Sequence, residues 1–146
     1  MPWLTRSQYA LYGIMIMAIW RGLGYYMVLF LAGLESIPRE FYEAASIDGA
    51  SGLQRFRFIT FPLMKPVISF IIIILVITGL KFFEPMFIMT QGGPDNATKV
   101  LTLNIYQNAF QFFKMGYASA MSVLMFFAII FVTIFQLRLF RTEARL

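Results

Sequence analysis

The sequence predicts an all-α membrane protein with about three transmembrane helices. The first observation is composition: 60% of the 146 residues are hydrophobic and only 13% are charged, whereas about 25% is usual for a soluble domain. The second is that three apolar stretches each approach or exceed the roughly 20 residues needed to cross a bilayer as a helix. The third is a polar, helix-forming segment between the first two stretches. The surplus apolar surface needs lipid, so we expect the chain to be embedded in a membrane.

The three spans are expected at about residues 9–34, 66–89 and 115–137. Arg21 interrupts the first, the second contains Lys81 and Glu84, and the third holds no charge. An unpaired charge inside a span costs roughly 2.5–3.5 kcal/mol on insertion scales. Because Lys81 and Glu84 are three residues apart, we expect them to share a helix face and pair.

An odd number of spans puts the two ends of the chain on opposite sides of the membrane. Lys and Arg concentrate on the cytoplasmic side of membrane proteins. The loop 35–65 and the tail after residue 137 carry most of the basic residues outside the spans: Arg39, Arg55, Arg57, Lys65, Arg138, Arg141 and Arg145. The other side has only Arg6, Lys99 and Lys114. We therefore expect the loop and the C-terminus in the cytoplasm.

The loop 35–65 is predicted to form two short helices. Pro38 suits a first helical turn, and Gly49 ends that helix, where a left-handed residue is often needed. Ser51 and Gln54 have the spacing of a capping box that opens the second helix. We expect Pro62 to stop this helix before the second span begins.

The segment 90–114, on the opposite side, starts with the turn formers Gln91-Gly92-Gly93-Pro94-Asp95. A short helix over 98–113 is expected to follow, with one side formed by Leu101, Ile105, Ala109 and Phe112. It either lies in the membrane interface or under a partner, or it is simply a re-entrant connector.

Composition also limits the chemistry of the chain. It contains no Cys and no His, which excludes thiolate or imidazole metal sites and Cys/His or Ser/His catalysis within it. No Gly-Lys-Ser/Thr phosphate loop occurs, so the chain cannot bind ATP in the P-loop manner. We therefore expect no cofactor in this chain and any energy source on another subunit. The net charge of +5 comes from scattered basic residues that flank apolar runs. Membrane topology explains them better than nucleic-acid binding does.

The loop carries the most specific pattern. Glu43-Ala44-Ala45, then Gly49, Ile59 and Pro62, closely resembles the cytoplasmic loop of binding-protein-dependent ABC importer permeases. The resemblance implies that this loop docks on an ABC ATPase subunit. The candidate docking residues are Glu43, Ala44, Ala45, Asp48, Gly49, Ile59 and Pro62. Small and acidic residues together make a surface that another protein can approach closely, whereas the alternative is a solvated connector.

The resemblance extends beyond the loop. Leu34-Glu35-Ser36-Ile37-Pro38 is similar to the same family, and three later segments are similar to its sugar-importing branch: Thr90-Gln91-Gly92-Gly93-Pro94, Ile105-Tyr106 with Ala109-Phe110, and Gly116-Tyr117-Ala118-Ser119-Ala120. The implied partners are ABC ATPase subunits, a second permease, an extracytoplasmic sugar-binding protein, a carbohydrate substrate and membrane lipid. The implied location is the plasma (inner) membrane.

Two features depart from the family pattern. Phe61 stands before the last proline of the motif, where the family usually has Leu. Family permeases also normally have about six spans, and this chain resembles only the last three. It is therefore expected to be a fragment, a truncated reading frame or one half of a split subunit.

The resemblance suggests a role for the charges inside the spans. Arg21, Lys81 and Glu84 are a possible translocation path, because sugars need hydrogen-bonding groups and stacking rings. The rings nearby in sequence are Tyr25, Tyr26, Phe82 and Phe83.

The leading interpretation is thus the permease component of an ATP-driven sugar importer. The alternative is a truncated or non-transporting membrane protein that binds an ABC ATPase or permease and assists assembly. An intramembrane enzyme would need convergent catalytic groups, which the Lys81/Glu84 pair alone does not supply.

Overall fold

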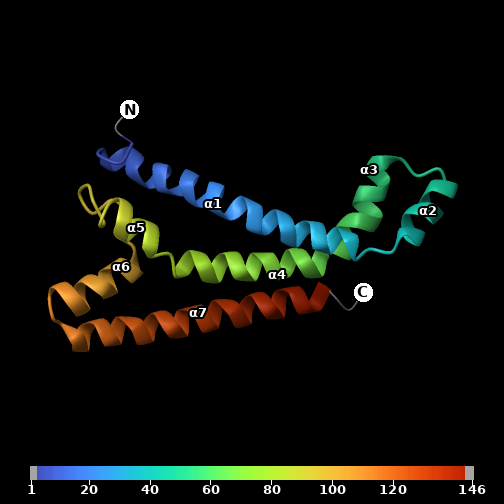
Figure 1. Ribbon diagram of the computed structural model, residues 1–146. Coiled ribbons are helices and arrows are strands. Elements are labelled where there is room, and N and C mark those ends of the chain that lie inside the picture. Colours follow the sequence, from blue (N-terminus) through green and yellow to red (C-terminus); the bar gives the residue numbers. More distant parts are fainter. Residues whose placement is uncertain (1–2, 144–146) are drawn as a thin grey trace.

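Three long helices dominate the computed structural model, which describes residues 3–143 and the side chains of residues 3–140. They are α1 (Ser7–Glu35), α4 (Phe61–Leu80) and α7 (Met115–Glu143), and α4 contacts both of the others (Figure 1). The described residues contain no strand. Three helical stretches are long and apolar enough to cross a membrane, namely Ser7–Glu35, Gly52–Met89 and Met115–Phe140. The predicted all-α fold with three such helices is confirmed.

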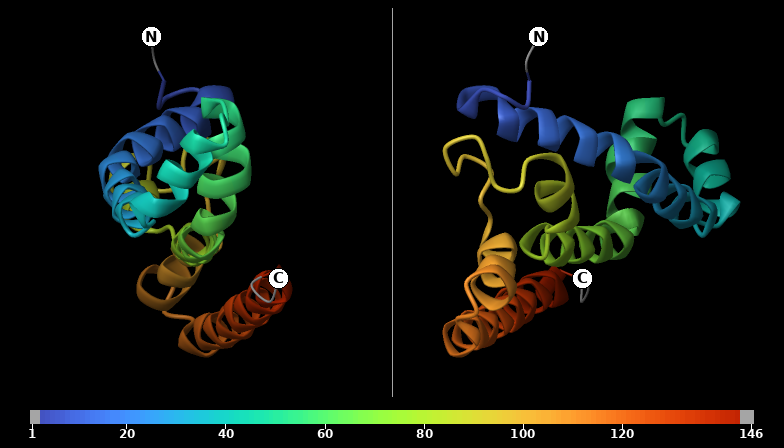
Figure 2. Two further views of the ribbon diagram at one scale, coloured as in Figure 1. Left: turned by 90° about the vertical axis from the view of Figure 1, so that its right-hand side faces the viewer. Right: turned by 60° about the vertical axis from the view of Figure 1, so that its left-hand side comes forward.

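The helices form an open arrangement with a small core. Ile14, Met86 and Leu103 make up its fully or almost fully buried apolar cluster, while α7 diverges from the rest (Figure 2). Large apolar side chains cover the outside of the long helices, and Trp20 is 82% exposed. So much exposed apolar surface is typical of a face covered by lipid or by another protein.

The short helices gather at the two ends of the molecule. Helices α2 (Arg39–Ile47) and α3 (Gly52–Arg55) project beyond α1 and α4 at one end. At the other end lie α5 (Glu84–Met89) and α6 (Leu101–Tyr106), near the start of α1 (Figure 1). The first and last described residues are at opposite ends, as an odd number of spans requires. Which end faces the cytoplasm stays a prediction, and Arg145, one of the basic residues behind it, lies outside the described residues.

The predicted stop at Pro62 is wrong. Helix α3 continues through a π-helical turn, η1 (Phe56–Thr60), directly into α4. Pro62 lies in the first turn of α4. Just before it, the backbone N–H of Phe61 bonds to the carbonyl of Phe56, five residues earlier. The π turn shifts the hydrogen-bond register just before the proline, so the helix passes Pro62 without ending.

The second span is also not one continuous helix. Helix α4 ends at Leu80, and a short non-helical linker, Lys81–Phe83, separates it from α5. Pro85 in the first turn of α5 lacks an N–H, so it cannot bond to the carbonyl of Lys81 and continue α4. The linker is instead held from α6, where the Thr102 hydroxyl donates to the Phe82 carbonyl at 2.9 Å.

The helix predicted over 98–113 is shorter than expected. It comprises α6 and a π-helical turn, η2 (Gln107–Gln111). Of the side described from the sequence, Ala109 is buried and Ile105 is half-buried, whereas Leu101 and Phe112 are exposed. Leu103 and Asn108 are also buried. The π turn changes the angular position of every residue after Tyr106, which a regular 3.6-residue period does not anticipate.

Candidate docking loop and groove

The docking loop, residues 38–62, presents small, acidic and apolar side chains at one tip of the molecule. Glu43, Ala44, Asp48 and Gly49 are exposed, and Ala45 is half-buried. The structure thus brings the first five candidate docking residues together on α2 and the turn after it. The other two candidates lie on the next helical segment, where Ile59 in η1 is half-buried and Pro62 at the start of α4 is exposed.

Gly49 gives the turn after α2 its shape. Its φ of +74° is in the left-handed region that favours glycine, and the N–H of Ala50 bonds back to the Ala45 carbonyl at 2.9 Å. The expectation that Gly49 ends the helix in this conformation is confirmed. So is the capping box, in which the Ser51 hydroxyl accepts from the Gln54 N–H while the Gln54 side chain accepts from the Ser51 N–H.

Side-chain hydrogen bonds hold α2 against the helix that follows. The hydroxyls of Tyr42 and Thr60 are 2.9 Å apart, joining α2 to η1. Arg55 donates from Nη1 to the Ser46 Oγ at 3.1 Å, and Ser46 donates to the Tyr42 carbonyl at 2.7 Å. The loop is therefore a folded hairpin of two helices.

Two exposed apolar residues of the loop were missed as candidate docking residues. Ile47 is 87% exposed and Leu53 is 77% exposed, on either side of the Gly49 turn. Their position could have been read from the sequence, since both stand within four residues of the turn glycine. Single exposed apolar residues are common, but two at a projecting tip beside acidic and small residues suit contact with a partner.

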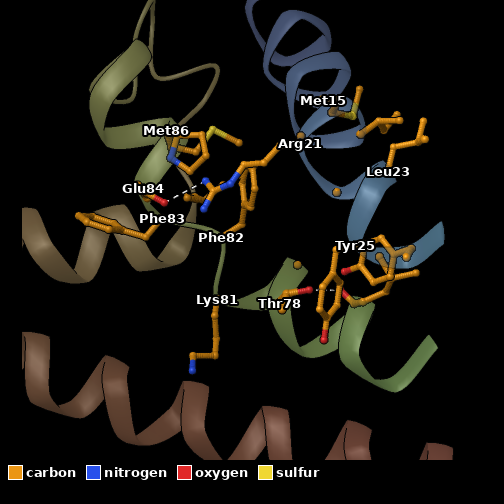
Figure 3. Close-up of a pocket in the computed structure, with 18 residues that line it drawn as sticks. Met15, Arg21, Leu23, Tyr25, Thr78, Lys81, Phe82, Phe83, Glu84 and Met86 are labelled. Atoms are coloured by element: carbon orange, nitrogen blue, oxygen red, sulfur yellow. Dashed lines mark hydrogen bonds and ion pairs between the residues drawn. The ribbon is translucent and has the colours of Figure 1, made fainter. Parts of the chain in front are cut away.

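A groove of about 920 Å³ lies where α1 passes the linker between α4 and α5 (Figure 3). The three predicted path residues Arg21, Lys81 and Glu84 all line it, as do the four rings noted from the sequence, Tyr25, Tyr26, Phe82 and Phe83. The groove therefore combines charged groups with aromatic faces from two segments about 60 residues apart in the chain.

The ion pair in this groove differs from the expected one. Glu84 Oε2 accepts from Arg21 Nη1 at 2.9 Å, so the pair joins α1 to α5. Figure 3 shows Lys81 pointing away from Glu84. The predicted Lys81–Glu84 pair is wrong because helix α4 ends at Leu80, which leaves the two residues without a common helix face.

The paired groups remain accessible. The side chains of Arg21 and Glu84 are each 61% exposed, and the rings of Tyr25 and Tyr26 meet edge to face at a centroid distance of 5.3 Å. Donors, acceptors and ring faces in one groove can bind a polar ligand with hydroxyl groups.

No group of three metal-ligating side chains occurs among the described residues, and the absence of a cofactor from this chain stays a prediction.

Comparison with known proteins shows to which family the chain belongs. A family model described as "Binding-protein-dependent transport system inner membrane component" matches residues 2–145. The chain belongs to this family. It is 40% identical over 141 residues to the sulfoquinovosyl glycerol transport system permease protein SmoG of Agrobacterium fabrum, covering 97% of this chain and 46% of SmoG. It is 37% identical over 137 residues to the probable starch degradation products permease AmyD of Thermoanaerobacterium thermosulfurigenes, covering 94% of this chain and 47% of AmyD.

The chain spans about half the length of these two relatives. A relative of more similar extent is the putative ABC transporter permease protein ORF1 of a Caldicellulosiruptor species, 43% identical over 86% of this chain and 90% of ORF1. The structure also matches a chain of a bacterial ABC transporter that imports alginate, with a TM-score of 0.88, over 97% of this chain and 50% of that chain. At 23% identity this last likeness supports the fold alone. The family assignment makes the chain a multi-pass membrane component of a transport system.

Proposed function

We propose that this chain forms the membrane-spanning part of an ATP-driven importer for a carbohydrate. The observation that carries the proposal is the family match over residues 2–145. The names of SmoG and AmyD, both permeases for carbohydrate-containing molecules, support a sugar as the cargo. The energy then comes from ATP hydrolysis on a separate subunit.

The docking loop is the proposed contact with the ATPase, on the cytoplasmic side. Its accessible residues support this role, since Glu43, Ala44 and Gly49 lie together at a projecting tip. The continuous helical stretch from Gly52 to Leu80 links that tip to the groove. A movement of the loop therefore reaches the groove through a helix and not through a flexible segment.

The groove is the proposed part of the translocation path. Arg21 and Glu84 provide donors and acceptors for sugar hydroxyls, and the tyrosine and phenylalanine rings provide stacking faces. Lys81 lines the same groove. Because a conformational change needs a difference in interaction energy between two states, the sugar and the ATPase must each favour one arrangement of this path.

The exposed apolar faces of the long helices are the proposed contacts with lipid and with a second permease. Three helices in an open arrangement do not enclose a path (Figure 2). We therefore include a second permease, and an extracytoplasmic binding protein that delivers the sugar, among the partners.

Uptake of labelled oligosaccharides by cells with and without the gene for this chain tests the function. Loss of uptake of at least one sugar, restored by the gene, is expected. If uptake of every sugar stays normal while the chain still co-purifies with an ABC ATPase, the transport proposal fails and a non-transporting assembly role takes its place.

A further inference from the structure

A second recess, of about 560 Å³, lies at the end of the molecule opposite the docking loop. The residues that line it come from the segment before α6, from α6 and η2, and from the turn into α7. They are Lys99, Asn104, Asn108, Phe112, Lys114 and Tyr117. The recess shares no residue with the groove or the docking loop, and its role does not depend on the proposed function.

The backbone after η2 brings the two lysines to one place. The N–H of Phe112 bonds to the Gln107 carbonyl at 2.9 Å, and the N–H of Lys114 bonds to the Asn108 carbonyl at 2.7 Å. Phe113 between them has a φ of +53°, which reverses the chain direction so that α7 folds back beneath α6. Lys114 thereby lines the same recess as Lys99, which precedes α6.

The charged residues that line the recess are lysines, and none is acidic. Two ammonium groups belong to it, and no Asp or Glu is among its lining residues. Asn104 directs its amide at the sulfur of Met121 at 3.7 Å, a weak acceptor, while the buried Asn108 donates its amide to Asn104. The amides of both asparagines thus donate within the chain, and the two ammonium groups are what would attract an anion with acceptor oxygens.

The recess lies at the end of a helix that is able to cross a membrane. Lys114 directly precedes α7, one of the helices able to cross a membrane. Phe112, Phe113 and Tyr117 around it are exposed, Phe113 by 80%. Aromatic residues and lysines at the end of a span lie at the level of the lipid headgroups.

We propose that this recess binds the phosphate group of an anionic phospholipid. Both lysines attract the single negative charge of the phosphodiester of phosphatidylglycerol, which has no amine of its own, whereas phosphatidylcholine carries a compensating positive charge. The exposed aromatic side chains pack on the glycerol and the first acyl carbons. The site then anchors the turn between η2 and α7 to the membrane surface.

The test measures phospholipid retained by the purified chain in native mass spectrometry, after exchange into mixed phosphatidylglycerol and phosphatidylcholine. The unaltered chain is expected to retain phosphatidylglycerol in preference. The double variant Lys99→Gln, Lys114→Gln should bind phosphatidylglycerol roughly 30-fold more weakly, and each single variant roughly 5-fold. Each lysine near an anionic surface contributes a factor of about five to the affinity. The matched control is Arg6→Gln, which removes a cation from the same end without altering the lining of the recess.

Three further arms keep the proposal open to refutation. The variant Lys99→Arg, Lys114→Arg should restore retention, which separates charge from an effect on folding, and circular dichroism checks that each variant is helical. Inorganic phosphate at millimolar concentration should not displace the lipid, because it lacks the acyl chains; complete displacement would show a site for free phosphate and overturn the lipid assignment. Equal retention of both phospholipids, or equal loss in Arg6→Gln, also overturns it.

Discussion

Gly49 shows how one residue combines backbone and surface requirements. Its positive φ restricts which side chains fit, while a Cβ at this position would meet no atom of the chain within 4 Å. Within this chain a substitution at Gly49 therefore meets backbone strain and no clash at its Cβ, and a close partner would add a steric cost that grows with the size of the side chain.

The first prediction concerns this position. Gly49→Trp is expected to reduce uptake roughly tenfold per ATP hydrolysed, because a buried contact with the ATPase is lost. Gly49→Asn serves as the control, since Asn tolerates the left-handed conformation and is small. The measurement is ATP hydrolysis and uptake in the same vesicles. Normal coupling in Gly49→Trp contradicts close approach of a partner at this turn.

The Arg21–Glu84 pair supports the second prediction. Gln at position 84 keeps an acceptor oxygen for the Arg21 guanidinium, so Glu84→Gln should leave assembly intact. It should lower uptake several-fold if the carboxylate faces the sugar. Lys81→Gln, in the same groove but pointing away from Glu84, is the matched comparison and should have the smaller effect. Unchanged uptake by Glu84→Gln removes this residue from the mechanism.

At the scale of elements, the docking loop depends on the contact between α2 and η1. The Tyr42–Thr60 hydrogen bond joins them at 2.9 Å, and the loss of one such bond costs about 1 kcal/mol. Tyr42→Phe should therefore raise the hydrogen-exchange rate of the α2 amides roughly fivefold. Tyr12→Phe, on the exposed surface of α1, should leave these amides unchanged. Equal protection of α2 in both variants would mean that the bond does not hold the loop.

The linker between α4 and α5 gives a prediction of stability. Thr102→Val preserves the shape of the side chain but leaves the Phe82 carbonyl without its donor from α6, at a cost of about 1–3 kcal/mol. Thr133→Val is the control, because the Thr133 hydroxyl bonds only within α7, to the Ile129 carbonyl. Thermal unfolding in detergent should show a lower midpoint for Thr102→Val than for Thr133→Val. The same midpoint in both would refute the role of Thr102 as a clamp on the linker.

For the molecule as a whole, the sequence predicted what depends on near neighbours in the chain. The capping box at Ser51 and the left-handed Gly49 follow from local backbone chemistry, and the long spans follow from long, mostly apolar runs. The Arg21–Glu84 pair joins residues 63 positions apart, so no local pattern reveals it. The π turns likewise change the angular position of the residues after them, and their register depends on tertiary packing that a regular helical period does not contain.

The whole-molecule arrangement places the docking loop, the helical stretch Gly52–Leu80 and the groove in sequence along one path (Figure 1). The central claim is that a separate ATPase binds at the loop end of this path. Because the sequence contains no cysteine, one introduced cysteine gives a unique attachment point for a crosslinker.

The most direct test is to place that cysteine at the exposed Ala44 and identify what crosslinks to it in intact cells. We predict a protein with a Gly-Lys-Ser/Thr phosphate loop, and no such product from Asn96→Cys at the opposite end of the molecule. Absence of an ATPase from the Ala44→Cys product, or its appearance with Asn96→Cys instead, would contradict the assignment of the docking loop.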